Sequence, residues 1–425
     1  MDLKLQSQEA LAAMLKETRA AYEALQDKKL QLNMARGNPS PEQLALTMPM
    51  MNTLTADDSL ITEANEDCRN YGVLGGIPEA RKLFAELLSV PADEVFVAGN
   101  SSLQLMFNCI QIAFTHGIAG CEPWHKQENL KFLCPVPGYD RHFAVADYFG
   151  LQLIPVPMKP DGPDMDIVAE YVEKDPSVKG IWCVPVYSNP TGVIYSDEVV
   201  RRFASLKPAA KDFRIFWDNA YCIHHIVENP VQPLHITDAC KEFDSEDMIY
   251  QFVSTSKVTF AGAGVAAVNM SKANLAQFTK EIGIQTIGFD KINQMRHVRF
   301  FGDAAGVLAH MKKHAAVLKP KFDVVISMLE KELAPLGLGS WTVPQGGYFI
   351  SYQAPKGCAK RIVQLCKDAG VTLTPAGATY PYGNDPDDSN IRIAPTYPSV
   401  EALQQTMELF CLCVKLAAIE QLVHE

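Results

Sequence analysis

The sequence contains no hydrophobic run long enough to cross a membrane and no excess of positive charge. No uninterrupted apolar segment approaches the roughly 18 residues that a membrane-spanning helix needs. Lys and Arg total 38 against 49 Asp and Glu, so the formal net charge is −11. A general nucleic-acid binder needs a basic surface that replaces counterions. These two absences therefore argue against a membrane protein and against a general nucleic-acid binder.

Signals for secretion, disulfide bonding and metal binding are also missing. The N-terminal 25 residues mix acidic and basic side chains at helical spacing and have no apolar core, so a secretory signal is not expected. The 11 cysteines lie mostly inside apolar segments, and no Cys-x-x-Cys pair occurs. Cys411 and Cys413 stand two apart in a helical pattern, which is a poor spacing for metal ligands. The pattern predicts buried, reduced thiols in a cytoplasmic protein without a bound metal.

The sequence does contain the hydrophobic content and periodicity of a large α/β protein. Hydrophobic residues make up 48% and charged residues 20% of the 425 residues. Short apolar runs separated by helical patterns predict a seven-stranded, mainly parallel sheet with helices on both faces. The predicted strands are residues 95–98, 131–134, 151–155, 180–186, 214–217, 248–253 and 264–269.

The segments on either side of this sheet predict a second, smaller α+β domain. A long helical stretch at residues 291–316 would connect the two, and shorter strands and helices alternate after it. The first 30 residues read as an amphipathic helix, and residues 36–43 as a turn-rich crossing segment. We therefore expect residues 1–50 to belong with the small domain, residues 51–310 to form the large domain, and residues 311–425 the small one.

Two predicted strands end in residues that a protein core would not select. Asp218 ends an apolar strand, where a carboxylate is costly unless it meets a metal, an arginine or a protonated ring nitrogen. The adjacent His224 and His225 have no further ligand at a sensible spacing, which disfavours the metal. Lys257 follows another apolar strand. It could be a desolvated nucleophile toward aldehydes or an ordinary surface lysine.

Three further motifs each allow a structural and a functional interpretation. The run Gly-Asn-Ser-Ser, which contains Ser101 and Ser102, lies between a strand and a helix, so it could cradle a phosphate or simply cap the helix. Asn189 precedes a proline and could belong to a plain turn. Arg392 lies inside an apolar strand, where it needs a carboxylate partner from a ligand or from the protein.

In this order, the motifs GNSS, PVPGYDRH, YSNPTG, DNAY, STSK and RIAP resemble those of fold-type I pyridoxal-phosphate (PLP) aminotransferases. The resemblance covers nearly the whole chain. The segments LNMARGNPS, VSTSKVTFAGAG, DKINQMRHVRFF and PQGGYFIS are similar to the bacterial aspartate aminotransferase subgroup Ic. The resemblance implies a ping-pong transfer of the amino group from L-aspartate to 2-oxoglutarate, giving oxaloacetate and L-glutamate. It also implies a homodimer with active sites at the subunit interface.

The resemblance assigns the catalytic roles to three residues. Lys257 would hold the cofactor covalently through its ε-amine and, once released, carry a proton. Asp218 would keep the ring nitrogen of the cofactor protonated. Tyr221 would hydrogen-bond the ring oxygen O3′ together with Asn189.

The resemblance also implies the remaining cofactor and substrate contacts. His142 would brace Asp218, and Tyr139 would stack on the cofactor ring. The phosphate would be held by Ser101, Ser102, Ser254 and, from the neighbouring subunit, Tyr71. Arg392 would bind the α-carboxylate of the substrate, with Asn189 and Gly37 as further substrate contacts.

The chain departs from the family pattern in two places. Many relatives carry a phosphate-binding arginine shortly after the lysine, but Gly264 stands near that place here, which leaves backbone amides or Thr259 as substitutes. The basic residue that would bind the side-chain carboxylate is also open. The candidates are Lys291, Arg296, Arg299, Arg36 and Arg141.

Three other functions remain as alternatives to an aspartate enzyme. The donor could be alanine or a broad range of amino acids, or the cofactor could serve a lyase of the same fold. A transcription regulator with an aminotransferase-like domain is disfavoured, because the roughly 60 residues before the α/β alternation are not basic and contain no helix-turn-helix pattern.

Overall fold

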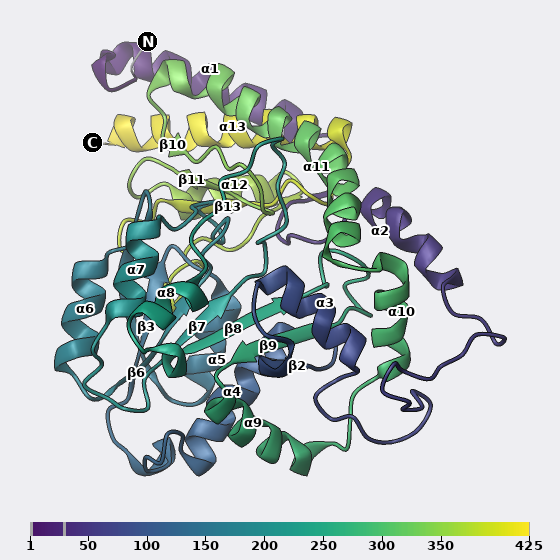
Figure 1. Ribbon diagram of the computed structural model, residues 1–425. Coiled ribbons are helices and arrows are strands. Elements are labelled where there is room, and N and C mark those ends of the chain that lie inside the picture. Colours follow the sequence, from purple (N-terminus) through teal and green to yellow (C-terminus); the bar gives the residue numbers. More distant parts are fainter. Residues whose placement is uncertain (1–2, 29–30, 425) are drawn as a thin grey trace.

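The computed structural model describes residues 3–28 and 31–424 and is built around an eight-stranded sheet (Figure 1). The strand order is β2-β9-β8-β7-β6-β3-β4-β5, and β9 and β5 run opposite to the other six. The strands are β2 (Val95–Val97), β3 (Lys131–Val136), β4 (Gln152–Lys159), β5 (Gly162–Pro163), β6 (Val178–Cys183), β7 (Arg214–Asp218), β8 (Ile249–Ser254) and β9 (Ala266–Met270).

All seven predicted strands are present in this sheet, and the prediction is one strand short. The additional strand, β5, has two residues and pairs antiparallel with Met158 and Lys159 at the end of β4. A strand of two residues is too short to show a hydrophobic period, so the sequence pattern could not reveal it.

Helices cover both faces of the sheet because successive side chains of a strand point to opposite sides. In β7, Phe216 packs with α4, α5 and α9, whereas Ile215 and Trp217 pack with α6, α7 and α8. These helices are α4 (Ser102–His116), α5 (Asp140–Tyr148), α6 (Met165–Lys174), α7 (Asp197–Ser205), α8 (Ile236–Glu242) and α9 (Lys272–Gln285). The alternation also separates Asp218 from its neighbours Trp217 and Asn219.

The predicted connecting helix at residues 291–316 is wrong in one respect, because two helices occupy the region. Helix α10 (Lys291–Phe301) ends at Gly302, whose φ of 77° is a left-handed conformation that glycine adopts readily. Asp303 then caps α11 (Ala304–Glu332) by accepting a hydrogen bond from the Gly306 amide. With α3 (Pro78–Leu88), α10 flanks one end of the large sheet (Figure 1).

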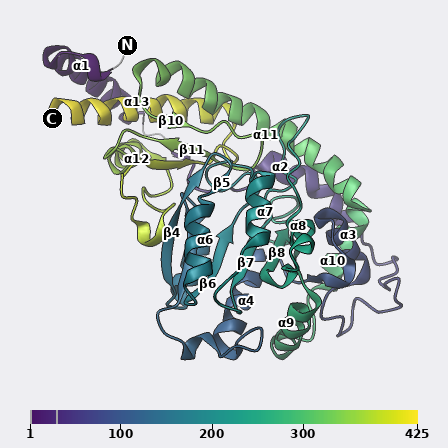
Figure 2. The same ribbon diagram turned by 60° about the vertical axis from the view of Figure 1, so that its left-hand side comes forward.

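A smaller lobe of strands and helices lies beyond the large sheet (Figure 2). The long helix α11 extends into it, and α1 (Gln8–Gln26) packs along α13 (Val400–His424). The assignment of residues 1–50 to the small domain stays a prediction. The other elements of the lobe are β1 (Leu32–Asn33), β10 (Ser340–Trp341), β11 (Ile350–Gln353), α12 (Ala359–Asp368), β12 (Val371–Thr372) and β13 (Asn390–Ile393).

The crossing segment between the lobes contains a helix where the sequence predicts only turns up to residue 43. Helix α2 (Pro41–Thr47) begins with a capping box, in which the Ser40 hydroxyl accepts from the Gln43 amide and the Gln43 side chain accepts from the Ser40 amide. Short 3-10 helices complete the described chain at Leu3–Leu5, Met48–Asn52, Ala92–Glu94, Trp124–Lys126, Glu246–Met248, Ala334–Leu336 and Pro381–Gly383.

The domain boundaries stay a prediction. The boundary at 310/311 falls inside α11, so this helix belongs to both lobes. All eleven cysteines are among the described residues, and each is a free thiol. Within residues 3–28 and 31–424, no helix is long and apolar enough to span a membrane.

Candidate active site

Most of the predicted site residues meet at one cavity of about 200 Å³ at the carboxyl ends of β6, β7 and β8. In open α/β sheets, this edge is where ligands bind. The predicted residues that line the cavity are Ser101, Ser102, Tyr139, His142, Asn189, Asp218, Tyr221, Ser254 and Lys257. Five of the six sequence motifs, far apart in the chain, thus contribute to one small space. GNSS, DNAY and STSK supply the hydroxyls, the aspartate and the lysine, PVPGYDRH and YSNPTG supply the rest, and RIAP is not in the lining.

Asp218 is a buried carboxylate with one free oxygen. Its side chain ends β7 and is 4% exposed as a residue. The Nε2 atom of His142 lies 3.0 Å from Oδ2, and the His142 ring stacks on Trp182 with a centroid distance of 4.6 Å. The other oxygen, Oδ1, has no hydrogen-bond partner among the described residues. A buried acceptor of this kind fits a positively charged donor, such as a protonated ring nitrogen in the cavity.

Lys257 faces the same cavity from the loop after β8. Burial lowers the pKa of its amine, the nearby Asp218 carboxylate raises it, and Arg392 lowers it. The net effect is a lowered pKa, which increases the share of the neutral, nucleophilic amine. Its Nζ lies 5.1 Å from the Tyr221 ring centroid. Burial raises the pKa of Tyr221 well above its usual range, so this phenol keeps its proton and can donate a hydrogen bond.

Hydroxyl groups gather where α4 begins. Ser101 is the N-cap of this helix and accepts from the Gln104 amide at 3.4 Å. Ser254 donates to Ser256, and Ser256 donates to the Asn100 carbonyl, both at 3.1 Å. Free amides and the positive end of the helix dipole favour an anion such as a phosphate at this point. Ser256 also lines the cavity, although the sequence analysis gave a phosphate role only to its neighbour Ser254.

The place of the missing phosphate-binding arginine is crowded for a side chain. A Cβ atom on Gly264 would lie 3.0 Å from the Thr255 hydroxyl oxygen and 3.2 Å from the Ser256 amide nitrogen. Thr259 does not line the cavity: it is fully buried, and its hydroxyl contacts Thr255 and His297. The suggestion that Thr259 replaces the arginine is therefore wrong, and serine hydroxyls and backbone amides are the anion-binding groups that remain.

Arg392 lies next to the cavity rather than in its lining. It is 7% exposed, and its Nη1 donates to Asp140 at 2.9 Å and to Asn189 at 3.3 Å. The guanidinium carbon lies 5.0 Å from the Phe349 ring centroid. A Cβ on Gly37 would approach that ring to 2.6 Å, so Gly37 packs against the group that supports Arg392. Asp140 was not selected from the sequence, although it stands inside the PGYDRH motif.

The remaining predicted residues do not reach the cavity within one chain. Tyr71 is 83% exposed and makes no part of the cavity lining. Of the five basic candidates, Lys291 donates to the Gly72 carbonyl at 3.0 Å and Arg299 pairs with Asp58 at 3.0 Å. None of the five lines the cavity, so the residue that binds the side-chain carboxylate of the substrate is not identified.

A buried set of hydrogen bonds joins the two lobes behind Lys257. The Tyr348 hydroxyl donates to the Lys257 carbonyl at 3.3 Å and accepts from the Gln43 side-chain amide at 2.9 Å. Gln43 also lies 3.1 Å from His314 on α11, and His310, one turn earlier, lies 3.0 Å from the Val258 carbonyl. Gln43 and Tyr348 are far from Lys257 in the sequence, so nothing in the local pattern could reveal this support.

Among residues 3–28 and 31–424, no three His, Cys, Asp or Glu side chains come together as a metal site. The site instead fits PLP. The free Asp218 oxygen suits its pyridine nitrogen, the Lys257 amine of lowered pKa suits its aldehyde, and the serines at the start of α4 suit its phosphate.

Comparisons with known proteins agree with this site. A family model described as aspartate amino-transferase matches residues 6–425. A putative aminotransferase from Mycolicibacterium smegmatis is 45% identical over 407 residues, which are 95% of each chain. The aspartate aminotransferase of Corynebacterium glutamicum is 43% identical over 413 residues, 97% of this chain and 95% of that protein. The crystal structure of an aspartate transaminase from the same species has a TM-score of 0.96 at 42% identity, with 99% of both chains covered. The chain therefore belongs to the aspartate aminotransferase family and is a fold-type I aminotransferase.

Proposed function

We propose that this aminotransferase moves the amino group of L-aspartate to 2-oxoglutarate, through PLP and by a ping-pong mechanism. One observation carries the proposal: Asp218, braced by His142, and Lys257 line the same cavity as the serines at the start of α4. The amino donor rests on similarity to relatives that are named aspartate aminotransferase or transaminase.

The cofactor residues have separate tasks in this proposal. When bound, PLP supplies an aldehyde carbon that takes the amino group and a ring that accepts electrons. Lys257 would hold that carbon through its amine, and the same amine would move a proton on and off the substrate Cα. Asp218 holds a proton on the ring nitrogen through charge and hydrogen bonding. Asn189 and Tyr221 donate hydrogen bonds to the ring oxygen.

The other residues bind and orient. Tyr139 covers the ring. Ser101, Ser102 and Ser254, together with Ser256, bind the phosphate through hydroxyl donors and the amides of α4. Arg392 binds the α-carboxylate of the substrate, while Asn189 and Gly37 fix the position of that end of the site.

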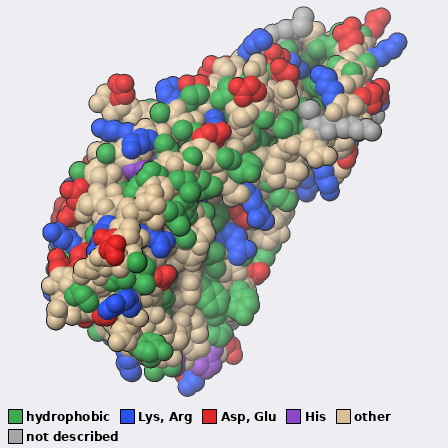
Figure 3. Space-filling view, turned by 90° about the vertical axis from the view of Figure 1, so that its right-hand side faces the viewer, with side chains coloured by type: hydrophobic (Ala, Val, Ile, Leu, Met, Phe, Trp, Pro, Cys, Tyr) green, Lys and Arg blue, Asp and Glu red, His purple; other side chains and the backbone are tan. Residues whose placement is uncertain are grey.

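We also propose that the active unit is a homodimer in which Tyr71 of one subunit contacts the phosphate in the other. Its support is the high exposure of Tyr71 within a single chain. Hydrophobic side chains gather over the middle and lower part of the face shown in Figure 3. Exposed large apolar residues include Met48, Met51, Ile61, Ile284 and Ile287. Contact with a second copy would remove such surface from water.

A donor screen tests the function directly. The PLP-loaded enzyme would be mixed with L-aspartate, L-glutamate, L-alanine or an aromatic amino acid, and conversion of the aldehyde to pyridoxamine phosphate followed by absorbance. We expect aspartate and glutamate to convert the cofactor with kcat/KM at least about tenfold above the other donors, because a charged contact is worth that much. A preference for alanine or aromatic donors would exclude the aspartate assignment. Product release with a persistent aldehyde spectrum would indicate a lyase.

Replacing Arg392 should weaken the binding of every amino donor. In Arg392→Gln, the substrate carboxylate loses a charged hydrogen-bond partner worth about 1.5–3 kcal/mol, so KM for L-aspartate should rise by about 10- to 100-fold. Steady-state kinetics with aspartate and alanine would measure the change. Arg202→Gln serves as the control, because Arg202 pairs with Asp166 on the protein surface. An unchanged KM for both donors would remove Arg392 from the substrate site.

A further inference from the structure

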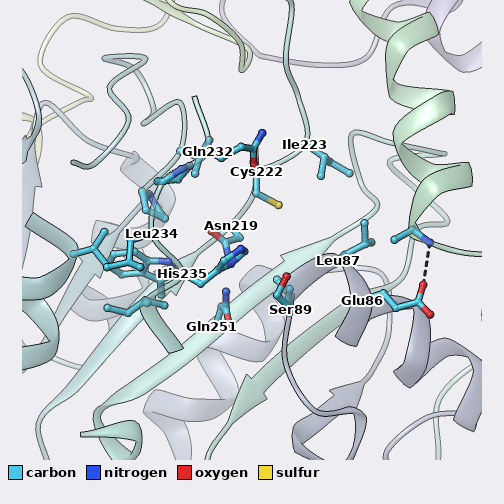
Figure 4. A pocket seen from close by; sticks show the side chains of 18 of the residues that line it. Glu86, Leu87, Ser89, Asn219, Cys222, Ile223, Gln232, Leu234, His235 and Gln251 are labelled. Atoms are coloured by element: carbon cyan, nitrogen blue, oxygen red, sulfur yellow. Dashed lines mark hydrogen bonds between the residues drawn. The ribbon is translucent and has the colours of Figure 1, made fainter. Parts of the chain in front are cut away.

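A second cavity lies on the other face of the sheet, away from Asp218. Its volume is about 240 Å³, and it opens between the end of α3, the start of α8 and the start of α11 (Figure 4). In the register of β7 with β8, Trp217 stands opposite Gln251, while Asp218 stands opposite Phe252. Because side chains alternate along strands, Trp217, Asn219 and Gln251 share the face that lines this cavity.

The floor of the cavity holds a polar atom that the described residues leave without a hydrogen-bond partner. Gln251 is 3% exposed, and its Oε1 has no hydrogen-bond partner among the described residues. Asn219, which is 8% exposed as a residue, also lines the cavity. Burying an amide oxygen without a partner costs about 1–3 kcal/mol, so Gln251 Oε1 indicates a ligand that supplies the missing bond. Figure 4 shows both side chains at this cavity.

The charged groups of the lining disfavour an anionic ligand, and its two histidines are His225 and His235. No lysine or arginine lines the cavity, and Glu86 adds a negative charge at the α3 side, where it accepts a hydrogen bond from the Ala304 amide. His225 is bonded to the Tyr187 hydroxyl at 2.7 Å, and burial lowers its pKa, so it is neutral at pH 7. Phosphates, amino acids and oxo acids would therefore enter with an unpaired charge.

The size and chemistry of the cavity suit a small molecule that can hydrogen-bond to a carboxamide. Apolar residues of its walls include Leu87, Val186 and Trp217, and the polar Gln232 and His235 also line it. The volume lies just below the roughly 300–1,000 Å³ of sites for drug-sized ligands, which suits one small ring system. A primary carboxamide presents a donor and an acceptor side by side, and asparagine and glutamine bind the edge of adenine in this way. We propose that this cavity binds an uncharged nitrogen heterocycle of the nucleobase type, recognised by Asn219 and Gln251.

Calorimetric titration of the PLP-loaded enzyme with adenine, adenosine and AMP tests the proposal. We expect adenine to bind the native enzyme. Gln251→Met keeps the volume of the side chain but removes the amide, and should weaken adenine binding at least tenfold, as should Leu87→Trp, which fills the cavity from α3. Gln364→Met, at an exposed position of α12, should bind adenine like the native enzyme. Comparing the affinities of adenine and adenosine shows whether the cavity takes the free base or the base of a nucleoside.

Three results would overturn the proposal. The first is no binding of any of the three compounds up to about 5 mM, a range that includes affinities as weak as about −4 kcal/mol. The second is equal adenine affinity in the native enzyme and in Gln251→Met. The third is tighter binding of AMP than of adenine, because recognition would then come from the phosphate. Gln251 and Leu87 lie outside the candidate active site, so these results are independent of the transamination assay.

Discussion

Lys257→Ala should lose transamination almost completely, with kcat reduced by at least about 10³-fold. The variant lacks both the amine that holds the cofactor and the group that moves the proton, and each of these functions contributes a large rate factor. Borohydride treatment followed by mass spectrometry gives an independent measurement. It should attach pyridoxyl to the peptide that contains residue 257 in the native enzyme, and attach none in the variant.

Lys272→Ala is the matched control for this experiment. Lys272 is an exposed lysine of α9 that pairs with Asp93, so its loss should change neither the kinetics nor the trapping. Equal trapping in Lys257→Ala and in the native enzyme would show that another lysine holds the cofactor. Activity close to the native value would reject the entire assignment of the site.

Asp218→Asn should reduce kcat/KM by about 10²- to 10³-fold while the fold is retained. The amide has almost the same shape as the carboxylate but has no charge with which to keep a ring nitrogen protonated, and the loss of one such electrostatic contact has effects of this size. Steady-state kinetics would measure the loss, and thermal denaturation would verify that the variant is folded. Asp166→Asn, at an exposed position of α6, provides the control.

Asp218→Asn should also change the pKa of the Lys257 amine, which can be measured separately from the kinetics. The Asp218 carboxylate raises the pKa of the Lys257 amine, so its removal should lower that pKa further. In the cofactor-free protein, labelling of Lys257 by an amine-specific reagent should therefore extend to lower pH in Asp218→Asn than in the native chain. A labelling profile that does not move, together with kcat/KM within about threefold of native, would show that Asp218 is not coupled to the reaction.

The main features of the fold follow from hydrophobic patterning. The prediction errors occur at helix boundaries that are set by a few residues. The central strands are fully buried and therefore read as continuous apolar runs, as in β7 and β8. The break at Gly302 was missed because apolar periodicity continues across it, although a glycine followed by a capping aspartate is a helix boundary signal. The start of α2 was missed although Ser40-Pro41-Glu42-Gln43 matches a capping box.

The site could be predicted as far as its residues lie in local motifs. Asp218 ends β7 and Lys257 follows the neighbouring parallel strand β8, so the sheet places them at the same edge. The pairing of Asp140 with Arg392 joins residues 252 positions apart, and no pattern within either segment specifies it. The burial of Thr259 away from the cavity includes a contact with His297 of α10, which is 38 positions away in the chain. Contacts of this kind are set by packing between elements, which a single sequence does not contain.

The hydrogen bonds from Gln43 through Tyr348 to the carbonyl of Lys257 make the attachment point of the catalytic lysine sensitive to the relative position of the lobes. Tyr348 precedes strand β11 of the small lobe, whereas Lys257 follows β8 of the large sheet. A rotation of one lobe against the other must either stretch these bonds or carry the lysine backbone with it. The relative orientation of the two lobes and the position of the Lys257 amine are thus geometrically linked.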